Sequence, residues 1–178
     1  MAKLGANVAL LGMIGKDGFG KFLQSELIRY GVDINGLIVN EEADTSASVV
    51  LIDSSGERTF LHTLGANGVF CETDVNYNII KNADIVFIAG SMLMPSFDGC
   101  GCAKLLQTAK AMGKTTVLDT AWDDKGRWMD VLEPCMQYID YFIPSIEEAE
   151  QLSNESAPEK IAKVFFDKGI RSVVIKLG

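Results

Sequence analysis

The chain has 178 residues, of which 48% are hydrophobic, and a formal net charge of −8 at pH 7. This length accommodates one domain with a full core, and the acidic balance without any Lys/Arg cluster argues against nucleic acid as a partner. No apolar run approaches the ~20 residues of a membrane helix. The start also lacks the apolar region of a signal peptide, so we expect a cytoplasmic protein with no membrane association.

The first predicted element is a buried strand over residues 8–14, which enters a turn with glycines at 12, 15, 18 and 20 and then an amphipathic helix. Phe19, Phe22, Leu23 and Leu27 fall at the spacing of a buried helical stripe. A helix that emerges from such a turn can bind an anion at its N-terminus. The alternative is a structural turn whose glycines only relieve backbone strain, and both interpretations stay open.

Two other phosphate-binding patterns fit this turn poorly. Residues 15–21 have the P-loop spacing G-x-x-x-x-G-K, but Phe22 stands where a Ser or Thr hydroxyl is needed for Mg²⁺. A dinucleotide-binding fingerprint is also disfavoured, because the glycines never fall as G-x-G-x-x-G. Asp33 follows Gly12 at about the distance of a ribose-binding acid, but it precedes the next apolar run rather than ending it.

Two strands without an intervening helix come next. Residues 45–53 and 57–63 alternate as strands, and Ser54-Ser55-Gly56 between them is a hairpin signal. This interruption predicts a small antiparallel β lid, inserted at about residues 36–66 and projecting from a parallel sheet. We expect Val49, Leu51 and Phe60 to form an apolar face on the lid that needs a partner.

From residue 73 onward, helices and strands alternate. The expected helices cover residues 73–81, 96–112, 125–132, 146–152 and 158–168, and the expected strands cover 84–90, 115–119, 138–143 and 172–178. This alternation predicts an α/β fold, a parallel sheet with helices on both faces. Residues 1–178 are expected to form a single domain.

The expected strands end in polar or glycine residues where ligands of parallel sheets bind. Asp119 follows an apolar run and could bind a hydroxyl or a hydrated metal, or could simply cap the next turn. Ser145 and Glu148 have the S-x-x-E form of a capping box, which by itself explains the pair. The single histidine, His62, lies in a strand, where an ordinary strand residue is the simplest interpretation.

Cysteine spacing gives no sign of a metal or disulfide framework. The four cysteines form no C-x-x-C pair and have no nearby histidine: Cys71, Cys100, Cys102 and Cys135. Cys100 and Cys102 are too close for an unstrained local disulfide, and the set is too sparse for a zinc site. We expect reduced thiols.

Several segments together resemble one family in its own order. These are Gly15-Lys-Asp-Gly-Phe-Gly20, Gly56-Glu-Arg-Thr-Phe60 with Gly65-Ala-Asn67, Asp119-Thr-Ala-Trp-Asp123 with Gly126-Arg-Trp128, and Pro144-Ser-Ile-Glu-Glu-Ala-Glu-Gln-Leu152. They resemble the signature regions of the ribokinase-like (PfkB) carbohydrate kinases over nearly the whole chain. The chain departs from the family where Ala121 and Asp123 replace Asn and Arg, and where Ser145 replaces Asn.

The resemblance implies a three-layer ribokinase-like fold with a β lid, and ATP-dependent phosphorylation of a sugar hydroxyl with Mg²⁺. It also implies a small-molecule sugar as the partner and a homodimer formed through the lid. The implied substrate-binding residues are Gly15, Thr45, His62, Ser91 and Asp119. Ser145 and Glu148 would contact the cofactor, and Glu148 would organise the metal.

Two family segments do not occur in this sequence. Family members carry a gly-gly-x-x-x-asn sugar-binding segment at the amino-terminal side and a gly-ala-gly-asp segment with the catalytic base at the carboxyl-terminal side. We therefore assign no catalytic residue and expect a fragment of a kinase that is inactive by itself. The alternative is a non-catalytic α/β module that binds a small polyol or phosphate or associates with another chain.

Overall fold

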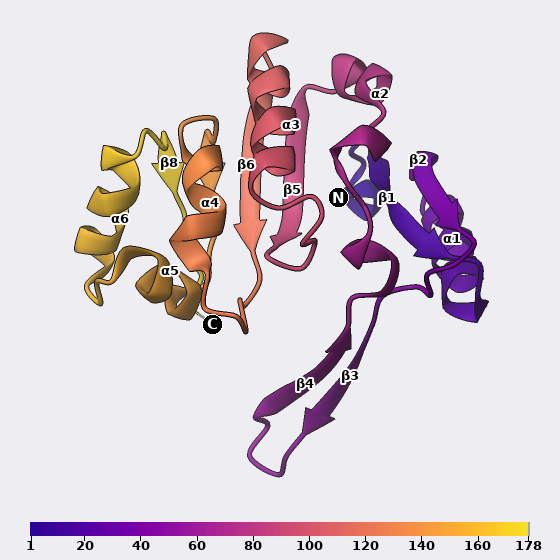
Figure 1. Ribbon diagram of the computed structural model, residues 1–178, viewed down its shortest axis with the longest axis horizontal. Coiled ribbons are helices and arrows are strands. Elements are labelled where there is room, and N and C mark those ends of the chain that lie inside the picture. The colour runs from indigo at the N-terminus through magenta and orange to yellow at the C-terminus, as the bar shows by residue number, and fades with distance from the viewer. Residues whose placement is uncertain (178) are drawn as a thin grey trace. The chain divides into compact units, whose positions relative to one another are not determined.

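The computed structural model describes residues 1–177, which divide into two compact units. Unit 1 comprises residues 1–70 and 74–76, and unit 2 comprises residues 71–73 and 77 onward. Figure 1 shows the elements of both units along the chain. The short 3₁₀ segment η3 (Glu72–Asp74) lies where the chain passes from one unit to the other.

Unit 1 is built on a parallel strand pair. After η1 (Ala2–Leu4), β1 (Ala9–Gly15) leads through α1 (Gly18–Arg29) to β2 (Asp33–Asn40), which pairs with β1 in parallel. The predicted first strand is confirmed, but only its carboxyl-terminal half is buried: Met13 and Ile14 are in the core, whereas Leu10 is exposed. The side chains that come next along the chain are therefore held on a rigid strand end.

The predicted buried stripe of α1 is wrong. Phe19 and Phe22 are 65% and 61% exposed, and Leu23 is also exposed. Gly20 is the buried residue of this helix, and a Cβ there would collide with the carbonyl oxygen of Gly15. The first turn of α1 therefore packs against backbone through a glycine, and the two phenylalanines line a pocket instead of entering the core.

The predicted hairpin is confirmed as a separate two-stranded sheet. β3 (Ala47–Ile52) and β4 (Arg58–Thr63) pair antiparallel with each other only, and the hairpin projects from the parallel strands of unit 1 (Figure 1). Asp53 closes its turn by accepting hydrogen bonds from the amides of Ser55 (2.8 Å) and Glu57 (3.0 Å). η2 (Gly65–Gly68) follows. The first residues of the predicted lid segment, 36–40, belong to β2.

The register of the hairpin separates side chains that the sequence pattern placed together. Val49 lies opposite Leu61, and Val50 lies opposite Phe60. Because directly opposed residues share a face and successive residues alternate, Phe60 is on the other face from Val49. Both faces of the lid are consequently apolar and exposed.

Unit 2 contains a four-stranded parallel sheet in the order β5-β6-β7-β8. Its strands are β5 (Ile85–Ser91), β6 (Thr115–Thr120), β7 (Tyr141–Phe142) and β8 (Ser172–Val173). Its helices are α2 (Tyr77–Asn82), α3 (Cys100–Ala111), α4 (Trp128–Met136), α5 (Ile146–Ser153) and α6 (Pro158–Asp167). The strands and helices expected after residue 73 are therefore confirmed in type and order, with ends that differ by a few residues.

One face of this sheet is covered and the other is open in the described residues. On β5, Val86 and Ile88 are buried, whereas Ile85 and Phe87 are 60% and 41% exposed. Leu118 and Phe142 continue the buried face, where Phe142 meets Phe165 of α6 edge-on at 4.9 Å between ring centroids. The expected helical layer therefore covers one face of this sheet in residues 77–177, and apolar side chains lie exposed on the other.

A buried carboxylate joins three elements at the amino-terminal edge of the sheet. Asp140, directly before β7, accepts hydrogen bonds from Lys110 Nζ of α3 (2.6 Å) and from the amide of Thr116 in β6 (2.9 Å). Burial alone would raise the pKa of Asp140, but the bonds and charge from Lys110 and the Thr116 amide outweigh it and hold the pKa below its ordinary value. The ionised form is therefore the one that stabilises the fold.

We expect Asp140→Asn to lower the free energy of unfolding at pH 7 by about 1–3 kcal/mol, because it removes a charge-assisted acceptor from a nearly buried site. Since the folded pKa is lowered, the stabilisation is present above the unfolded pKa of about 3.9 and is lost as pH falls through the folded value. The difference in unfolding free energy between the variant and the wild type should therefore decrease at acid pH. Urea unfolding followed by tryptophan fluorescence measures this, because Trp122 and Trp128 both lie in unit 2.

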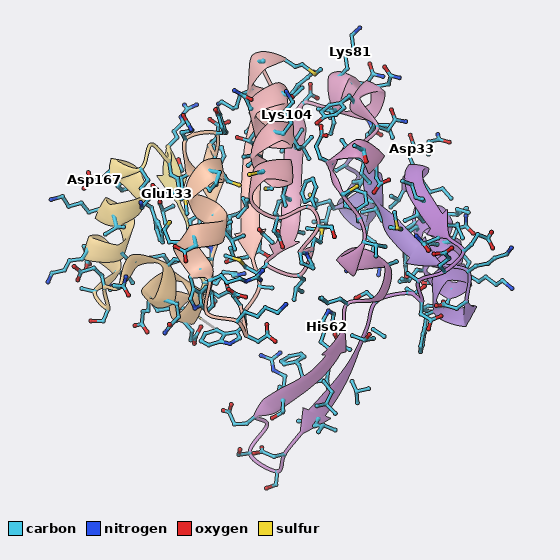
Figure 2. All side chains as sticks on the ribbon, viewed as in Figure 1. Asp33, His62, Lys81, Lys104, Glu133 and Asp167 are labelled. Carbon is cyan, nitrogen blue, oxygen red and sulfur yellow. The ribbon has the colours of Figure 1, made fainter. Side chains whose placement is uncertain are left out.

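Glu133→Gln is the matched control for Asp140→Asn. Glu133 lies on α4 (Figure 2) and forms an exposed ion pair with Lys168 at 2.6 Å. Such surface pairs contribute about 0–1 kcal/mol. Equal losses for the two variants would contradict a structural role for Asp140.

Candidate functional site

Unit 1 places its polar residues around Asp17, directly after β1. Asp17 is the N-cap of α1 and accepts a hydrogen bond from the Gly20 amide at 2.7 Å. It also accepts bonds from the amide of Thr45 (2.6 Å) and from Thr45 Oγ1 (2.8 Å). These bonds, first of all that from the Thr45 amide, lower the pKa of Asp17. A negative charge is thus held at the start of α1, where the helix dipole favours it.

Two predicted substrate-binding residues, Gly15 and Thr45, meet in this cluster. The Gly15 amide donates to Thr45 Oγ1 at 2.9 Å, and the Thr45 side chain is buried. A Cβ at Gly15 would lie 2.5 Å from the carbonyl oxygen of Ala43. The glycine is therefore needed for a close backbone approach. Their polar groups bond to one another, which favours the structural interpretation of the turn, and contact with substrate stays a prediction.

A pocket of about 870 Å³ lies beside this cluster. It is lined by Asp17, Gly18, Phe19, Phe22, Asp44, Thr45, Ala47 and Thr63. The base of the hairpin and the first turn of α1 thus border one hollow, whose walls are mainly apolar with two carboxylates.

His62, the third predicted substrate-binding residue of unit 1, lies on β4 (Figure 2). Its Nδ1 is 2.7 Å from the hydroxyl of Ser48, the residue opposite it on β3. The side chain is exposed, and its second ring nitrogen is not engaged by any described residue. His62 is therefore a cross-strand partner that still offers one polar atom, and its role in binding stays a prediction.

In unit 2, the loop after β5 is organised by Asp98, which the sequence analysis did not single out. Asp98 accepts bonds from Ser91 Oγ (3.0 Å) and from the amides of Met92 (3.1 Å) and Met94 (2.9 Å). Burial raises the pKa of this carboxyl, against the lowering effect of those donors. The predicted residue Ser91 is fully buried and donates inward. The one feature of the sequence that could have indicated this role is that Asp98 is an acidic residue shortly before a helix.

Asp119, at the end of β6, forms an ion pair with Lys176. Lys176 Nζ lies 2.6 Å from Asp119 Oδ1, and both side chains are partly exposed. A carboxylate can accept about four hydrogen bonds and an ammonium can donate three. The pair therefore retains an acceptor and a donor side by side, which is the combination that binds a hydroxyl group. The sequence analysis identified Asp119 but not its partner.

Glu148 combines a helix cap with a carboxylate oxygen to which no described residue donates. The capping box predicted at Ser145 and Glu148 is confirmed: the Glu148 amide donates to Ser145 Oγ at 3.2 Å, and the Ser145 amide donates to Glu148 Oε2 at 2.9 Å. Thr120 Oγ1 donates to the same oxygen at 2.8 Å. No described residue bonds to Oε1, and every buried side-chain oxygen described has a partner. Glu148 is buried overall, at 8% exposure, and Oε1 is its carboxylate oxygen without a donor among the described residues.

The structure holds no preformed multidentate metal site in residues 1–177. No group of three or more His, Cys, Asp or Glu side chains there is arranged to hold an ion. Mg²⁺, however, is commonly bound by one or two carboxylates together with waters and substrate phosphates. Glu148, with one oxygen fixed and one without a donor among these residues, fits that mode. Across the same residues, no helix is long and apolar enough to cross a membrane.

The profile of the pfkB family carbohydrate kinases matches residues 1–178. The chain is 26% identical to the ribokinase of Haemophilus influenzae and 29% identical to that of Staphylococcus aureus, in each case over 99% of this chain and 57% of the relative. The chain thus spans a little over half the length of these curated relatives.

Solved structures agree in fold. A provisionally named ribokinase II from E. coli superposes with a TM-score of 0.83 at 27% identity, over 99% of this chain and 59% of that one. The same protein in complex with ATP and Mg²⁺ gives a TM-score of 0.80 at 26% identity, over 98% and 58%. The predicted ribokinase-like α/β fold with its antiparallel lid is thereby confirmed, and the chain belongs to the pfkB family of carbohydrate kinases.

Proposed function

We propose that this protein functions in the ATP- and Mg²⁺-dependent transfer of a phosphoryl group to a sugar hydroxyl. The match of the family profile along the whole chain supports the reaction class, and the related ribokinase II structure with ATP and Mg²⁺ supports the cofactors. Phosphoryl transfer depends on positioning and charge stabilisation more than on covalent chemistry by the protein. The residues that bear on the proposal are therefore fixed polar groups at strand ends.

The Oε1 of Glu148, to which no described residue donates, is the observation that carries the proposal. Two donors on different elements, Thr120 of β6 and the Ser145 amide at the start of α5, hold the other oxygen. In our proposal Glu148 holds Mg²⁺ directly or through water, and Ser145 lies beside the nucleotide. The bound ion would neutralise charge on the phosphates. The protein's part is to keep one carboxylate oxygen at a set position before the ion arrives.

The sugar-binding role stays with the predicted residues of each unit. Gly15, Thr45 and His62 would act in unit 1, and Ser91 and Asp119 would act in unit 2. Of these, His62 and Asp119 retain unsatisfied hydrogen-bonding capacity at the surface. We expect these two to make direct contacts, and the buried Gly15, Thr45 and Ser91 to hold the loops in shape.

The 178-residue chain by itself should not phosphorylate sugars. The exposed apolar side chains on the second face of the unit 2 sheet support this, because such a face requires a covering partner. We expect no ADP release above an enzyme-free blank with pentoses, hexoses or nucleosides. Measurable sugar-dependent ADP release would refute this prediction and would mean that these residues suffice for kinase activity.

A Glu148→Gln variant tests the proposed metal role in a version of the protein extended to the length of the matched ribokinases. We expect kcat to fall much more than sugar affinity, because the loss of the charge affects the metal and the phosphates. If Glu148 only caps α5, kcat should hardly change and the unfolding free energy should fall by about 1 kcal/mol or less. Steady-state kinetics and thermal melting of the same preparation distinguish these results.

Ser153→Ala is the matched control for loss of stability in α5. Ser153 is buried in that helix and its hydroxyl donates to the Ala149 carbonyl at 2.7 Å. The Ser153→Ala substitution should lower the melting temperature without affecting kcat. An equal loss of kcat in both variants would assign the effect of Glu148→Gln to the helix rather than to the metal.

We further propose that the lid pairs with the lid of a second copy. A two-stranded hairpin is marginal in water by itself, and Val49 and Leu61 lie opposite each other with 58% of each exposed. We expect a dimer in sedimentation velocity that Leu61→Glu converts to monomer. Phe166→Glu, at a comparably exposed apolar site on α6, is the control and should stay dimeric. A wild-type protein that sediments as a monomer at every concentration would exclude the lid dimer.

A further inference from the structure

Trp122 is a large exposed aromatic residue at the carboxyl end of a parallel strand. It lies two residues after β6 and is 54% exposed. The preceding residue, Ala121, donates its amide to the carbonyl oxygen of Ser91 at the end of β5, at 2.8 Å. The backbone that leads to Trp122 is therefore anchored at the edge of the sheet where ligands of open parallel sheets bind.

The loop that carries Trp122 is held by one buried carboxylate. Asp123 accepts bonds from the amides of Lys125 (3.3 Å), Arg127 and Trp128 (3.1 Å), and from the Arg127 guanidinium at 2.9 Å. Burial would raise the pKa of Asp123, but the bonds from Arg127 and the amides lower it. This carboxylate thus fixes the backbone on the carboxyl-terminal side of Trp122.

A second tryptophan supports the exposed ring from behind. Trp128 is buried and meets Trp122 in an edge-to-face arrangement, with 4.9 Å between ring centroids and 80° between ring planes. Trp128 has a backbone φ of +33°, which is unfavourable for a bulky residue and persists only where the surroundings enforce it. A strained backbone at Trp128 and the buried Asp123 carboxylate thus both hold the loop that carries the half-exposed Trp122.

The charges around this indole are balanced. Residues 123–127 carry two carboxylates and two cations, and Arg127 is committed to Asp123. At the end of β6, Lys176 is likewise committed to Asp119. A ligand with a phosphate or carboxylate would therefore gain little attraction here. A neutral molecule with one apolar face and several hydroxyl groups fits an exposed indole whose charged neighbours are already paired.

We propose that Trp122 is the stacking platform for the apolar face of a neutral, unphosphorylated sugar ring. This inference rests on the proposed sugar-kinase function for the class of its ligand. It makes Trp122 a specificity-determining residue, because ring stacking selects sugars by their shape and by the side on which their C–H groups lie.

Indole N–H resonances of the 178-residue chain provide the test, because the sequence has two tryptophans. Trp122→Phe identifies the signal of Trp122. We expect saturable shifts of that signal on titration with neutral hexoses or pentoses, and no tighter binding of the corresponding sugar phosphates. In Trp122→Ala, where titration calorimetry replaces the lost signal, the binding should weaken about tenfold, the size of one good aromatic contact. Trp122→Phe should fall between, and Phe166→Ala, an exposed aromatic control on α6, should bind as wild type.

The inference is overturned if no sugar in the panel shifts the Trp122 signal, if only adenosine or ATP does so, or if Trp122→Ala binds sugar as tightly as wild type. Failure of the kinase proposal has a different signature. In that case the extended protein transfers no phosphate from ATP, while the Trp122 signal still responds to sugar. Conversely, sugar phosphorylation with an unchanged KM in Trp122→Ala would contradict only the role of Trp122.

Discussion

Backbone amides in the loops that follow the parallel strands need hydrogen-bond acceptors, and in this protein carboxylates provide them. Asp17 does so after β1, Asp98 after β5, Asp123 after β6 and Glu148 after β7. An unpaired buried amide costs about as much as a lost hydrogen bond. Each loop is therefore held in one conformation by a side chain within it or at its helix start. The loops at the carboxyl ends of these parallel strands owe their shape to these four acids.

These four carboxylates differ in what they have left to offer. Asp98 is partly buried and holds three donors at the end of β5 and in its own loop, and Asp123 is shielded completely and paired with Arg127. Glu148 uses one oxygen for structure and leaves the other without a donor among the described residues. A carboxylate that accepts hydrogen bonds from loop amides is thus a positioning residue at some strand ends and a candidate ligand-binding group at another. Counting acids at a strand end would not separate these roles, whereas following each oxygen to its donors does.

The apolar surfaces left exposed form a second consistent feature. In unit 1 they are the phenylalanines of α1 and both faces of the lid, and in unit 2 they are Ile85 and Phe87 on the open face of the sheet. Scattered exposed apolar residues are ordinary, but contiguous ones mark surfaces that bind other polypeptide. The chain spans 57% of the length of the related ribokinases.

Local chemistry determined much of what could be predicted from the sequence by itself. The Ser-Ser-Gly turn, the alternation of the lid strands and the S-x-x-E cap at Ser145 depend on residues close in the chain, and all three were predicted correctly. Recognition of the family rested on several such local segments in order. The types of the helices and strands after residue 73 could be predicted as well, because hydrophobic periodicity is also a pattern of residues close in the chain.

Only the tertiary structure decided which side chains were buried and which atoms remained available. Periodicity suggested a buried stripe on α1, yet Gly20 makes the close contact and Phe19 and Phe22 are exposed. Phe60 was grouped with Val49 until the cross-strand register placed it on the other face. The roles of Asp98 and Lys176 depend on partners far along the chain or on a loop conformation. Such contacts are set by how elements pack and by which amides burial leaves without water, and neither is encoded in the spacing of neighbouring residues.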